Sequence, residues 1–151
     1  MASIASILPP SNVFLDLDLT SKKRLFEQAG LLFENSHGIA RSAIFDALFA
    51  REKLGSTGLG QCVAIPHGRI KGLKEAVGMF VRLKQPIPFE APDGKAVQLA
   101  FVLLVPDQAT DLHLMILSEL AQLFSDKKVR EALLQAPTAE AVHQLLTQWQ
   151  S

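Results

Sequence analysis

The sequence predicts an α/β fold in which a mixed β-sheet is flanked by helices on both faces. Two kinds of apolar spacing support this prediction. Residues 13–19 and 76–83 place apolar side chains at every second position, which indicates strands. After residues 21 and 111, apolar side chains recur at the three- and four-residue spacing of helices. The predicted elements follow the order β-α-α-β-β-β-α-α-α. This order departs from strict alternation, so we expect parallel and antiparallel strands in one sheet.

The composition indicates one soluble domain spanning residues 1–151, because the chain has 151 residues of which 48% are hydrophobic. Its formal net charge is zero. Nucleic-acid binding usually needs a basic face, so no nucleic-acid partner is expected. The single cysteine fits a reducing compartment. The sequence shows no secretory signal and no apolar run near the length of about 18 residues that a membrane helix needs. We therefore expect a cytoplasmic protein without membrane insertion.

The N-terminal part of the chain predicts a strand followed by two helices. Residues 1–11 form a loose lead-in with room for one short helical turn. Thr20 or Ser21 can cap the first helix, whose end is expected within residues 35–38. The second helix, over residues 40–54, has apolar side chains nearly all round. Such a helix is usually largely buried.

The C-terminal part predicts a central strand and three helices. The unbroken apolar run over residues 99–105 is typical of a strand covered on both sides, and Pro106 ends it. A long connection over residues 85–98 precedes this strand. Three helices are expected after it, with caps at Thr110 or Asp111, at Asp126 and at Thr138.

A glycine-rich stretch over residues 55–69 contains the candidate nucleophile. The apolar run from Cys62 to Ile65 indicates a strand that Pro66 stops, and alternation places His67 on the same face as Ile65. A neutral imidazole is a good nucleophile near pH 7 because its unperturbed pKa is about 6.5. We therefore predict that His67 accepts a phosphoryl group. From spacing alone, a histidine that merely caps a loop explains the pattern equally well.

A possible phosphate cradle precedes this histidine. Successive backbone N–H groups of Ser56, Thr57 and Gly58 can form an anion-binding concavity. The run lacks the Gly-Lys-Ser or Gly-Lys-Thr of a phosphate-binding P-loop, and it follows a helix rather than a strand. For the glycines alone, an ordinary turn is the favoured explanation.

Two cationic or ionisable side chains are further candidates. Arg51, at the end of a predicted helix, can bind phosphoryl oxygens in a two-pronged fashion. Cations also favour the last turn of any helix, and the local sequence favours this simpler explanation. His113 lies in the first turn of a later helix, where protonation is disfavoured. A half-buried histidine bonded to the backbone is the favoured local explanation for it.

Other reactive side chains receive no role. His37 lies in a helix-ending loop, and His143 is expected to be exposed to solvent. Cys62 is expected to be a buried strand residue, and Asp16 and Asp18 lie on the outer face of a strand. No pair of histidines has the spacing of metal ligands, so neither a metal nor a cofactor is expected.

The runs 51–60 (REKLGSTGLG) and 63–68 (VAIPHG) closely resemble the enzyme IIA components of the bacterial phosphoenolpyruvate-dependent phosphotransferase system. More narrowly, they resemble its nitrogen-regulatory branch, which is related to the mannitol and fructose IIA domains. The resemblance covers nearly the whole chain. It implies the mannitol/fructose-type IIA fold, phosphorylation of His67 on Nε2, and a shared site with Arg51 and His113. Many relatives have Asn-Gly where this chain has Gln61-Cys62, so the loop near the site differs.

The resemblance also implies a function. The donor would be an HPr-like phosphocarrier, with Arg51, His113 and the N–H groups near Ser56 stabilising charge on the phosphoryl oxygens. An apolar patch around His67, including Leu59, would receive the donor. The phosphorylation state would regulate target proteins. The alternative is a standalone sugar IIA that passes the group to a sugar-specific IIB. The lack of an attached IIB or IIC portion favours the regulator, and the presence of His67 disfavours a member that has lost phosphorylation.

Overall fold

The two longest apolar runs become adjacent antiparallel strands, β5 and β6, at the centre of the sheet. The computed structural model describes residues 3–108 and 111–150. Within these residues the sheet has six strands in the order β1-β5-β6-β3-β2, and β4 also pairs with β6. β1 runs parallel to β5, and both β3 and β4 run parallel to β6, whereas β2 is antiparallel to β3. The predicted mixed sheet is therefore confirmed. The strands are β1 (Val13–Leu17), β2 (Gly58–Gly60), β3 (Val63–Ala64), β4 (His67–Ile70), β5 (Val77–Ile87) and β6 (Val97–Pro106).

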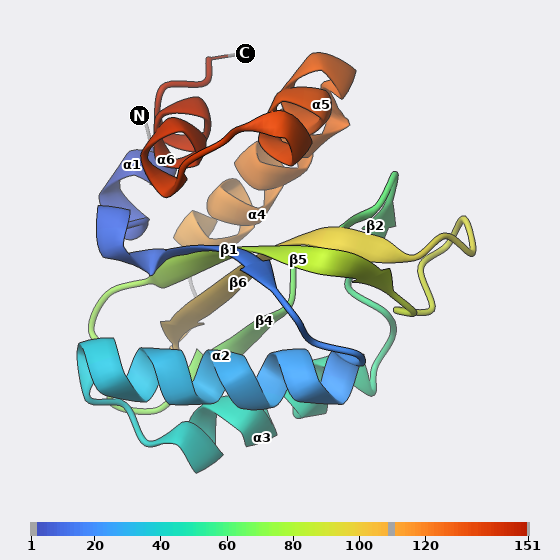
Figure 1. Ribbon diagram of the computed structural model, residues 1–151. Coiled ribbons are helices and arrows are strands. Elements are labelled where there is room, and N and C mark those ends of the chain that lie inside the picture. The colour runs from blue at the N-terminus through green and yellow to red at the C-terminus, as the bar shows by residue number, and fades with distance from the viewer. Residues whose placement is uncertain (1–2, 109–110, 151) are drawn as a thin grey trace.

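Helices cover both faces of this sheet (Figure 1). The helices α2 and α3 lie on one face, and α1, α4, α5 and α6 lie on the other (Figure 1). The apolar side chains of β6 alternate between the two cores, so both faces of this strand are buried as predicted. The helices are α1 (Ser3–Ile7), α2 (Lys22–His37), α3 (Arg41–Glu52), α4 (Asp111–Ser125), α5 (Lys127–Gln135) and α6 (Ala139–Thr147), with a 3-10 turn at Pro10–Asn12. None of the helices described is long and apolar enough to cross a membrane.

Side-chain caps fix the helix starts where the sequence predicts them. Ser21 accepts a hydrogen bond from the backbone N–H of Arg24, and Thr138 accepts one from Ala141. Asp126 caps α5 in the same way. α2 ends at His37 because Gly38 adopts a left-handed conformation with φ of 70°. The candidate cap Thr110 lies outside the described residues, and α4 begins at Asp111.

The prediction that α3 is largely buried is wrong. Ile44 and Leu48 are buried, but Ala43 and Ala50 are exposed and Phe45 is only half-buried. The reason is the position of α3, which packs against α2 and β4, while no helix or strand among the described residues covers its outer side (Figure 1). An apolar composition around a helix therefore does not ensure that neighbours cover it.

The tight turn between β2 and β3 corrects the placement of Cys62. Gln61 and Cys62 have φ values of 55° and 67°, and the flanking Gly60 and Val63 are paired across the hairpin. A two-residue turn with positive φ at both positions is a type I′ turn, which prefers Asn-Gly. Cys62 is therefore a half-buried turn residue rather than a buried strand residue. The backbone N–H of Gln61 donates to Asp93 across the loop.

This turn should gain stability from residues that tolerate positive φ. We expect the double substitution Gln61→Asn with Cys62→Gly to raise the free energy of unfolding by about 1 kcal/mol. The reason is that Gln61 and Cys62 both have left-handed backbone conformations, which are unfavourable for most residues and are tolerated by Asn and Gly. Denaturant unfolding measures the effect. Cys62→Ala is the control, since it removes the thiol and keeps the unfavourable φ. A double variant less stable than this control would contradict the explanation.

Two histidines without an expected role form contacts within the fold. The prediction that His143 is exposed to solvent is wrong, since the side chain is half-buried and its Nε2–H donates to the carbonyl of Leu8 at 2.8 Å. This bond ties α6 to the N-terminal segment. His37 accepts a hydrogen bond at Nε2 from the Nδ2 amide of Asn12, at 3.0 Å. Both imidazole rings therefore form hydrogen bonds within the fold.

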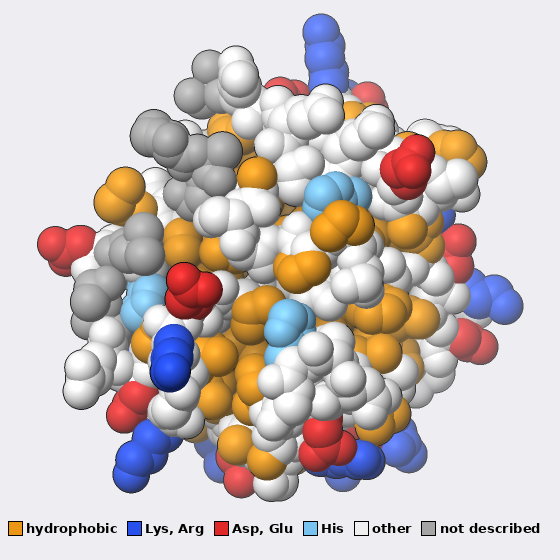
Figure 2. Space-filling view, turned by 90° about the vertical axis from the view of Figure 1, so that its left-hand side faces the viewer, with side chains coloured by type: hydrophobic (Ala, Val, Ile, Leu, Met, Phe, Trp, Pro, Cys, Tyr) orange, Lys and Arg blue, Asp and Glu red, His pale blue; other side chains and the backbone are white. Residues whose placement is uncertain are grey.

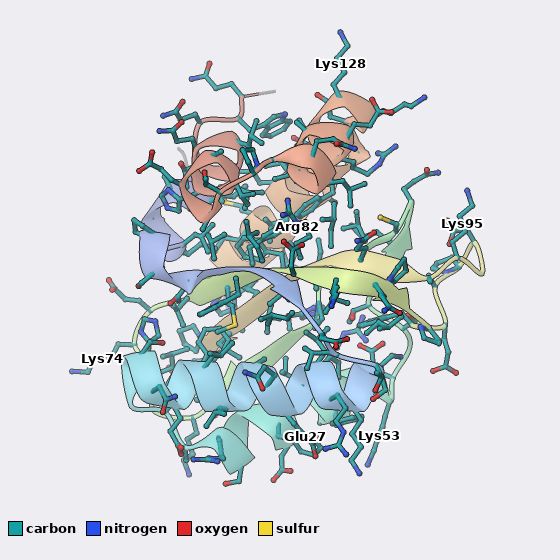
Figure 3. All side chains as sticks on the ribbon, viewed as in Figure 1. Glu27, Lys53, Lys74, Arg82, Lys95 and Lys128 are labelled. Carbon is teal, nitrogen blue, oxygen red and sulfur yellow. The ribbon has the colours of Figure 1, made fainter. Side chains whose placement is uncertain are left out.

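A buried arginine connects the sheet to α5. Arg82 lies on the β5 face that α5 covers (Figure 3), with only 7% of its surface exposed. Its Nη1 donates to the carbonyls of Leu133 and Ala136, at 2.9 and 2.7 Å, at the end of α5. Its Nε and Nη2 donate to the two carboxylate oxygens of Asp16. The guanidinium therefore satisfies carbonyl groups that the helix end leaves without partners.

Candidate functional site

His67 begins strand β4, immediately after the trans Ile65–Pro66 bond. The sequence predicted one strand ending at Pro66, with the histidine at its end. Instead, β3 ends at Ala64, and both β3 and β4 run parallel to β6. The proline separates the two strands because it has no N–H to donate, while its carbonyl still accepts from Leu103 N–H at 2.9 Å. The imidazole therefore projects from the start of a paired strand.

The hydrogen bond of the His67 ring fixes its tautomer. Nδ1 lies 2.9 Å from the carbonyl oxygen of Ile65. Because a carbonyl oxygen can only accept, Nδ1 carries the proton and donates it. The neutral ring then has its lone pair on Nε2. The nucleophilic atom of His67 is therefore Nε2.

The surroundings of His67 keep the imidazole neutral. Partial burial lowers its pKa from 6.5, because desolvation disfavours the charged form. The hydrogen bond to Ile65 opposes this shift, the positive charge of Arg51 adds to it, and the charge of Glu52 opposes it. The combined effect is a pKa of His67 below 6.5. The ring is therefore neutral near pH 7, which is the state that a nucleophile requires.

A pocket of about 640 Å³ brings the three candidate side chains together. His67 comes from β4, Arg51 from the last turn of α3, and His113 from the first turn of α4. The Nη1 of Arg51 donates to the carbonyl of Gly55 at 2.8 Å, which holds the guanidinium in place. Three elements far apart in the sequence thus contribute to one concave site.

The pocket also contains Arg69, which the sequence reasoning missed. Its side chain is exposed. The strand alternation of β4 could have identified it, because residues two apart in a strand share a face and Arg69 is two positions after His67. Two arginines therefore line the pocket where a single one was expected.

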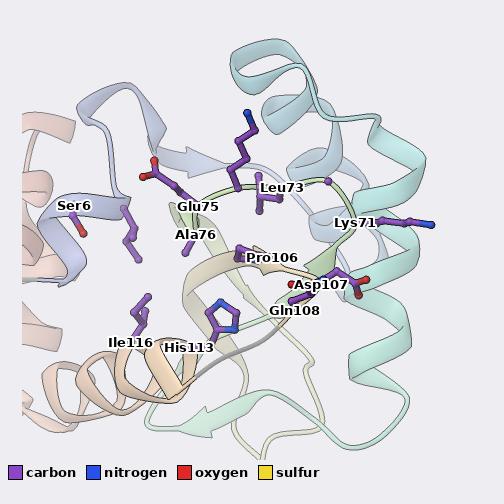
Figure 4. A pocket seen from close by; sticks show the side chains of 13 residues that line it. Ser6, Lys71, Leu73, Glu75, Ala76, Pro106, Asp107, Gln108, His113 and Ile116 are labelled. Atoms are coloured by element: carbon purple, nitrogen blue, oxygen red, sulfur yellow. The ribbon is translucent and has the colours of Figure 1, made fainter.

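His113 forms a nearly buried wall of the pocket, with 6% of its surface exposed. Burial lowers its pKa below 6.5, and the charge of Arg69 lowers it further. Its position at the start of α4 was predicted, and the pKa direction agrees with a ring that stays neutral. His113 also lines a second pocket of about 720 Å³, between residues 71–76 and the start of α4 (Figure 4). The imidazole therefore separates two adjoining cavities.

The expected phosphate cradle lies outside this pocket. None of Ser56, Thr57 and Gly58 lines it. The backbone N–H of Thr57 donates to the Glu52 carboxylate, and that of Gly58 donates to the hydroxyl of Ser56. A side chain at Gly58 would meet Ala91, since an added Cβ would lie 2.8 Å from the Cβ of that residue. Protein acceptors thus engage the N–H groups of Thr57 and Gly58, and packing explains the glycine.

Close packing brings α3 against the strand that carries the histidine. A Cβ added at Gly68 would lie 2.9 Å from the Cβ of Ala47 and 3.0 Å from its backbone carbon. Such distances are too short for carbon atoms. The glycine after His67 is therefore required for α3, and with it Arg51, to approach β4.

Exposed apolar side chains surround the pocket. Leu54 and Leu114 line it and are 83% and 67% exposed, and the adjacent Met115 is 60% exposed. Leu59 is 45% exposed but lies in β2 and does not line the pocket. Figure 2 shows one face of the molecule on which hydrophobic side chains adjoin histidine side chains and most charged groups lie nearer the margin. Within the described residues, no group of histidine, cysteine and acidic side chains could hold a metal ion.

Removing the charge of Arg51 should change the titration of His67. We expect Arg51→Gln to raise the pKa of His67 partway toward its ordinary value, because burial remains while the nearby positive charge is lost. Arg51→Lys keeps the charge and should leave the titration close to that of the wild type. A pH titration of the imidazole protons by NMR measures both. The assignment of the charge effect would be wrong if Arg51→Gln titrated at the wild-type midpoint.

Comparisons with known proteins agree on one family. The family described as phosphoenolpyruvate-dependent sugar phosphotransferase system, EIIA 2, matches residues 6–149. The chain is 41% identical over 152 residues to the nitrogen regulatory protein of Pseudomonas aeruginosa, covering 100% of this chain and 99% of the relative. It is 36% identical over 108 residues to a fructose-specific EIIA component of Haloferax volcanii, covering 72% and 70% of the two chains.

A solved structure supports the same assignment. The crystal structure of the nitrogen regulatory protein IIA-Ntr from Neisseria meningitidis matches with a TM-score of 0.91 and 56% identity, covering 95% of this chain and 99% of that one. The complex of enzyme IIAMTL and phosphorylated enzyme IIBMTL from Escherichia coli matches with a TM-score of 0.78 at 20% identity, which supports the fold alone.

Proposed function

Because the chain belongs to the EIIA 2 family of the phosphotransferase system, and to its nitrogen-regulatory branch, we propose that it is a phosphocarrier modified on Nε2 of His67. The observation that carries this proposal is the hydrogen bond from Nδ1–H to the carbonyl of Ile65. It leaves the lone pair on Nε2, and burial keeps the ring neutral. A free lone pair is the minimum requirement for attack on phosphorus.

The proposed reaction is a transfer between two histidines. The donor is a phosphohistidine of an HPr-like phosphocarrier. The Nε2 lone pair of His67 forms a bond to phosphorus while the nitrogen–phosphorus bond of the donor breaks, and the electron pair of that bond returns to the donor ring. The guanidinium groups of Arg51 and Arg69 and the ring of His113 stabilise charge on the phosphoryl oxygens. No phosphate contact in this mechanism involves Ser56, Thr57 or Gly58. The N–H groups of the last two residues already donate to side-chain oxygens of the protein.

The apolar rim of the pocket would receive the donor protein. Leu54, Leu114 and Met115 are large, exposed and next to the site. Exposed apolar patches of this kind mark protein contacts, and a small patch suits a brief complex. Leu59, in contrast, has no place in this contact, because it lies in β2 outside the pocket lining.

Regulation of target proteins is the favoured use of the phosphorylated state. A phosphoryl group adds up to about two negative charges at the rim, which can create or block an interface. Relatives that match nearly their whole length carry the name nitrogen regulatory protein. The alternative, transfer to a sugar-specific IIB, is supported by the match to a fructose-specific EIIA component. In either case we place the exchange in the cytoplasm, where the HPr-like donor is expected.

Incubation with phosphoenolpyruvate, enzyme I and an HPr-type protein tests the proposal. Intact mass measurement should show one phosphoryl group on the chain, and the adduct should be absent when the HPr-type protein is omitted. A wild-type chain that gains no phosphoryl group would overturn the proposed function. Adding a fructose-type IIB to the purified phosphorylated chain separates the two uses. Rapid transfer supports the sugar alternative, whereas a persistent adduct supports the regulator.

A further inference from the structure

The carboxylate of Glu52 is buried at the end of α3, with 5% of its side chain exposed. Its Oε1 accepts from the hydroxyl of Thr57 at 2.7 Å, and its Oε2 accepts from the backbone N–H of Thr57 at 3.1 Å. The ammonium of Lys22 lies 2.8 Å from Oε2 and compensates the charge. Thr57 is itself only 6% exposed. The carboxylate therefore holds both the backbone and the side chain of Thr57.

A continuous series of hydrogen bonds leads from this pair to the nucleophile. The carbonyl of Thr57 accepts from the backbone N–H of Ile65 at 3.0 Å. The carbonyl of Ile65 accepts from Nδ1–H of His67 at 2.9 Å. The position of the Ile65 peptide thus depends on Thr57 on one side and orients the imidazole on the other. Thr57 is therefore connected through two hydrogen bonds to the ring nitrogen that sets the His67 tautomer.

The same turn also holds the arginine of the site. Arg51 precedes Glu52 in the last turn of α3, and its Nη1 donates to the carbonyl of Gly55. Gly55 lies between Glu52 and Thr57, so the turn over residues 52–57 contacts both Arg51 and, through Ile65, His67. Groups that act together in phosphoryl transfer need to be held in a fixed relative geometry. This turn is the element that connects them.

We propose that Glu52 and Thr57 are positioning residues, which hold His67 in the Nδ1–H tautomer and keep Nε2 reactive. This inference rests on the proposed phosphorylation of His67. It gives the Ser-Thr segment of the glycine-rich loop a role that is distinct from binding phosphate. Glu52 and Thr57 act through hydrogen bonds to the turn, and neither lines the pocket.

The pair Thr57→Val and Thr57→Ser tests the inference. Valine keeps the shape of threonine and changes no charge, but a methyl group cannot approach Oε1 of Glu52 to the 2.7 Å that the hydroxyl adopts. The turn must therefore shift. Serine keeps the hydroxyl and is the matched control. Substitution of Glu52 is less informative, because its charge also acts on His67 directly.

Three measurements are made on each variant. Nitrogen NMR of the imidazole reports the tautomer, phosphoryl transfer from the phosphorylated HPr-type protein reports the rate, and phosphorus NMR reports the modified ring nitrogen. We expect Thr57→Val to populate the Nε2–H tautomer and to lose about tenfold in transfer rate, the scale of an outer-shell substitution. Thr57→Ser should retain the wild-type tautomer and most of the rate.

The outcomes separate this inference from the proposed function. A wild-type chain that takes no phosphoryl group removes the proposed function itself. A wild-type chain that is phosphorylated, together with a Thr57→Val variant of unchanged tautomer and rate, overturns the positioning role alone, even if thermal stability falls. If Thr57→Val does not fold, the wild-type spectrum still decides: a ring of His67 with its proton on Nε2 contradicts the inference.

Discussion

A chain with alanine in place of His67 is expected to gain no phosphoryl group under conditions in which the wild type gains one. The proposed mechanism has a single nucleophilic atom, Nε2 of this ring, with its lone pair set by the bond to Ile65. Alanine offers no nitrogen, and His113 cannot take its place because it is nearly buried and provides the pocket wall. Intact mass measurement after incubation with the donor proteins gives the result directly.

The control for this experiment is His143→Gln. His143 lies on α6, outside the pocket, and donates to the carbonyl of Leu8, which a glutamine amide can also do. This variant should be phosphorylated as fully as the wild type. An undiminished adduct on His67→Ala would place the phosphoryl group on another residue. In that case the geometry around His67 would need a different explanation.

Arg82→Met should lower the free energy of unfolding by about 3 kcal/mol. Methionine fills much of the same space, so the expected loss comes mainly from hydrogen bonds. The carbonyls of Leu133 and Ala136 would lose their guanidinium donor in a buried region. A buried acceptor without a partner costs about 1–3 kcal/mol. The pair with Asp16 adds little, because that carboxylate is 61% exposed.

Denaturant unfolding by circular dichroism measures this effect, with Lys84→Met as the matched control. Lys84 follows Arg82 at the next position on the same face of β5, but its side chain is exposed. The control should stay within about 0.5 kcal/mol of the wild type. Equal midpoints for the two variants would show that the bonds of Arg82 to α5 contribute no net stability.

Local patterns in the sequence predicted much of the fold. The period of two in residues 76–83 correctly indicated a strand, which the structure places at Val77–Ile87, and the apolar run of β6 correctly indicated burial on both faces. The caps Ser21, Asp126 and Thr138 start their helices as expected. These signals succeed because each depends on the backbone geometry of a few neighbouring residues.

Contacts between distant parts of the chain were harder to predict. The prediction that α3 is largely buried was wrong, because burial depends on which other elements cover the helix. The prediction that His143 is exposed was wrong because its hydrogen bond to Leu8 joins residues near opposite ends of the chain. The prediction that Arg51 and His113 share a site with His67 came from the resemblance to a family. The local sequence alone favoured a structural role for each of them. The hydrogen bond of the Thr57 N–H could not be predicted for a related reason, because its acceptor is the side chain of Glu52, whose direction the backbone pattern does not reveal.

The contact between Gly68 and Ala47 has a consequence for the geometry of the whole site. The strand that bears the imidazole and the helix that bears the guanidinium touch where neither has more than a hydrogen or a methyl group to interpose. The separation between the imidazole of His67 and the guanidinium of Arg51, which are proposed to meet one phosphoryl group, therefore depends on direct contact between the two backbones. The exposed rim side chains Leu54 and Leu114 take no part in this contact, so substitutions at the rim should leave that separation unchanged.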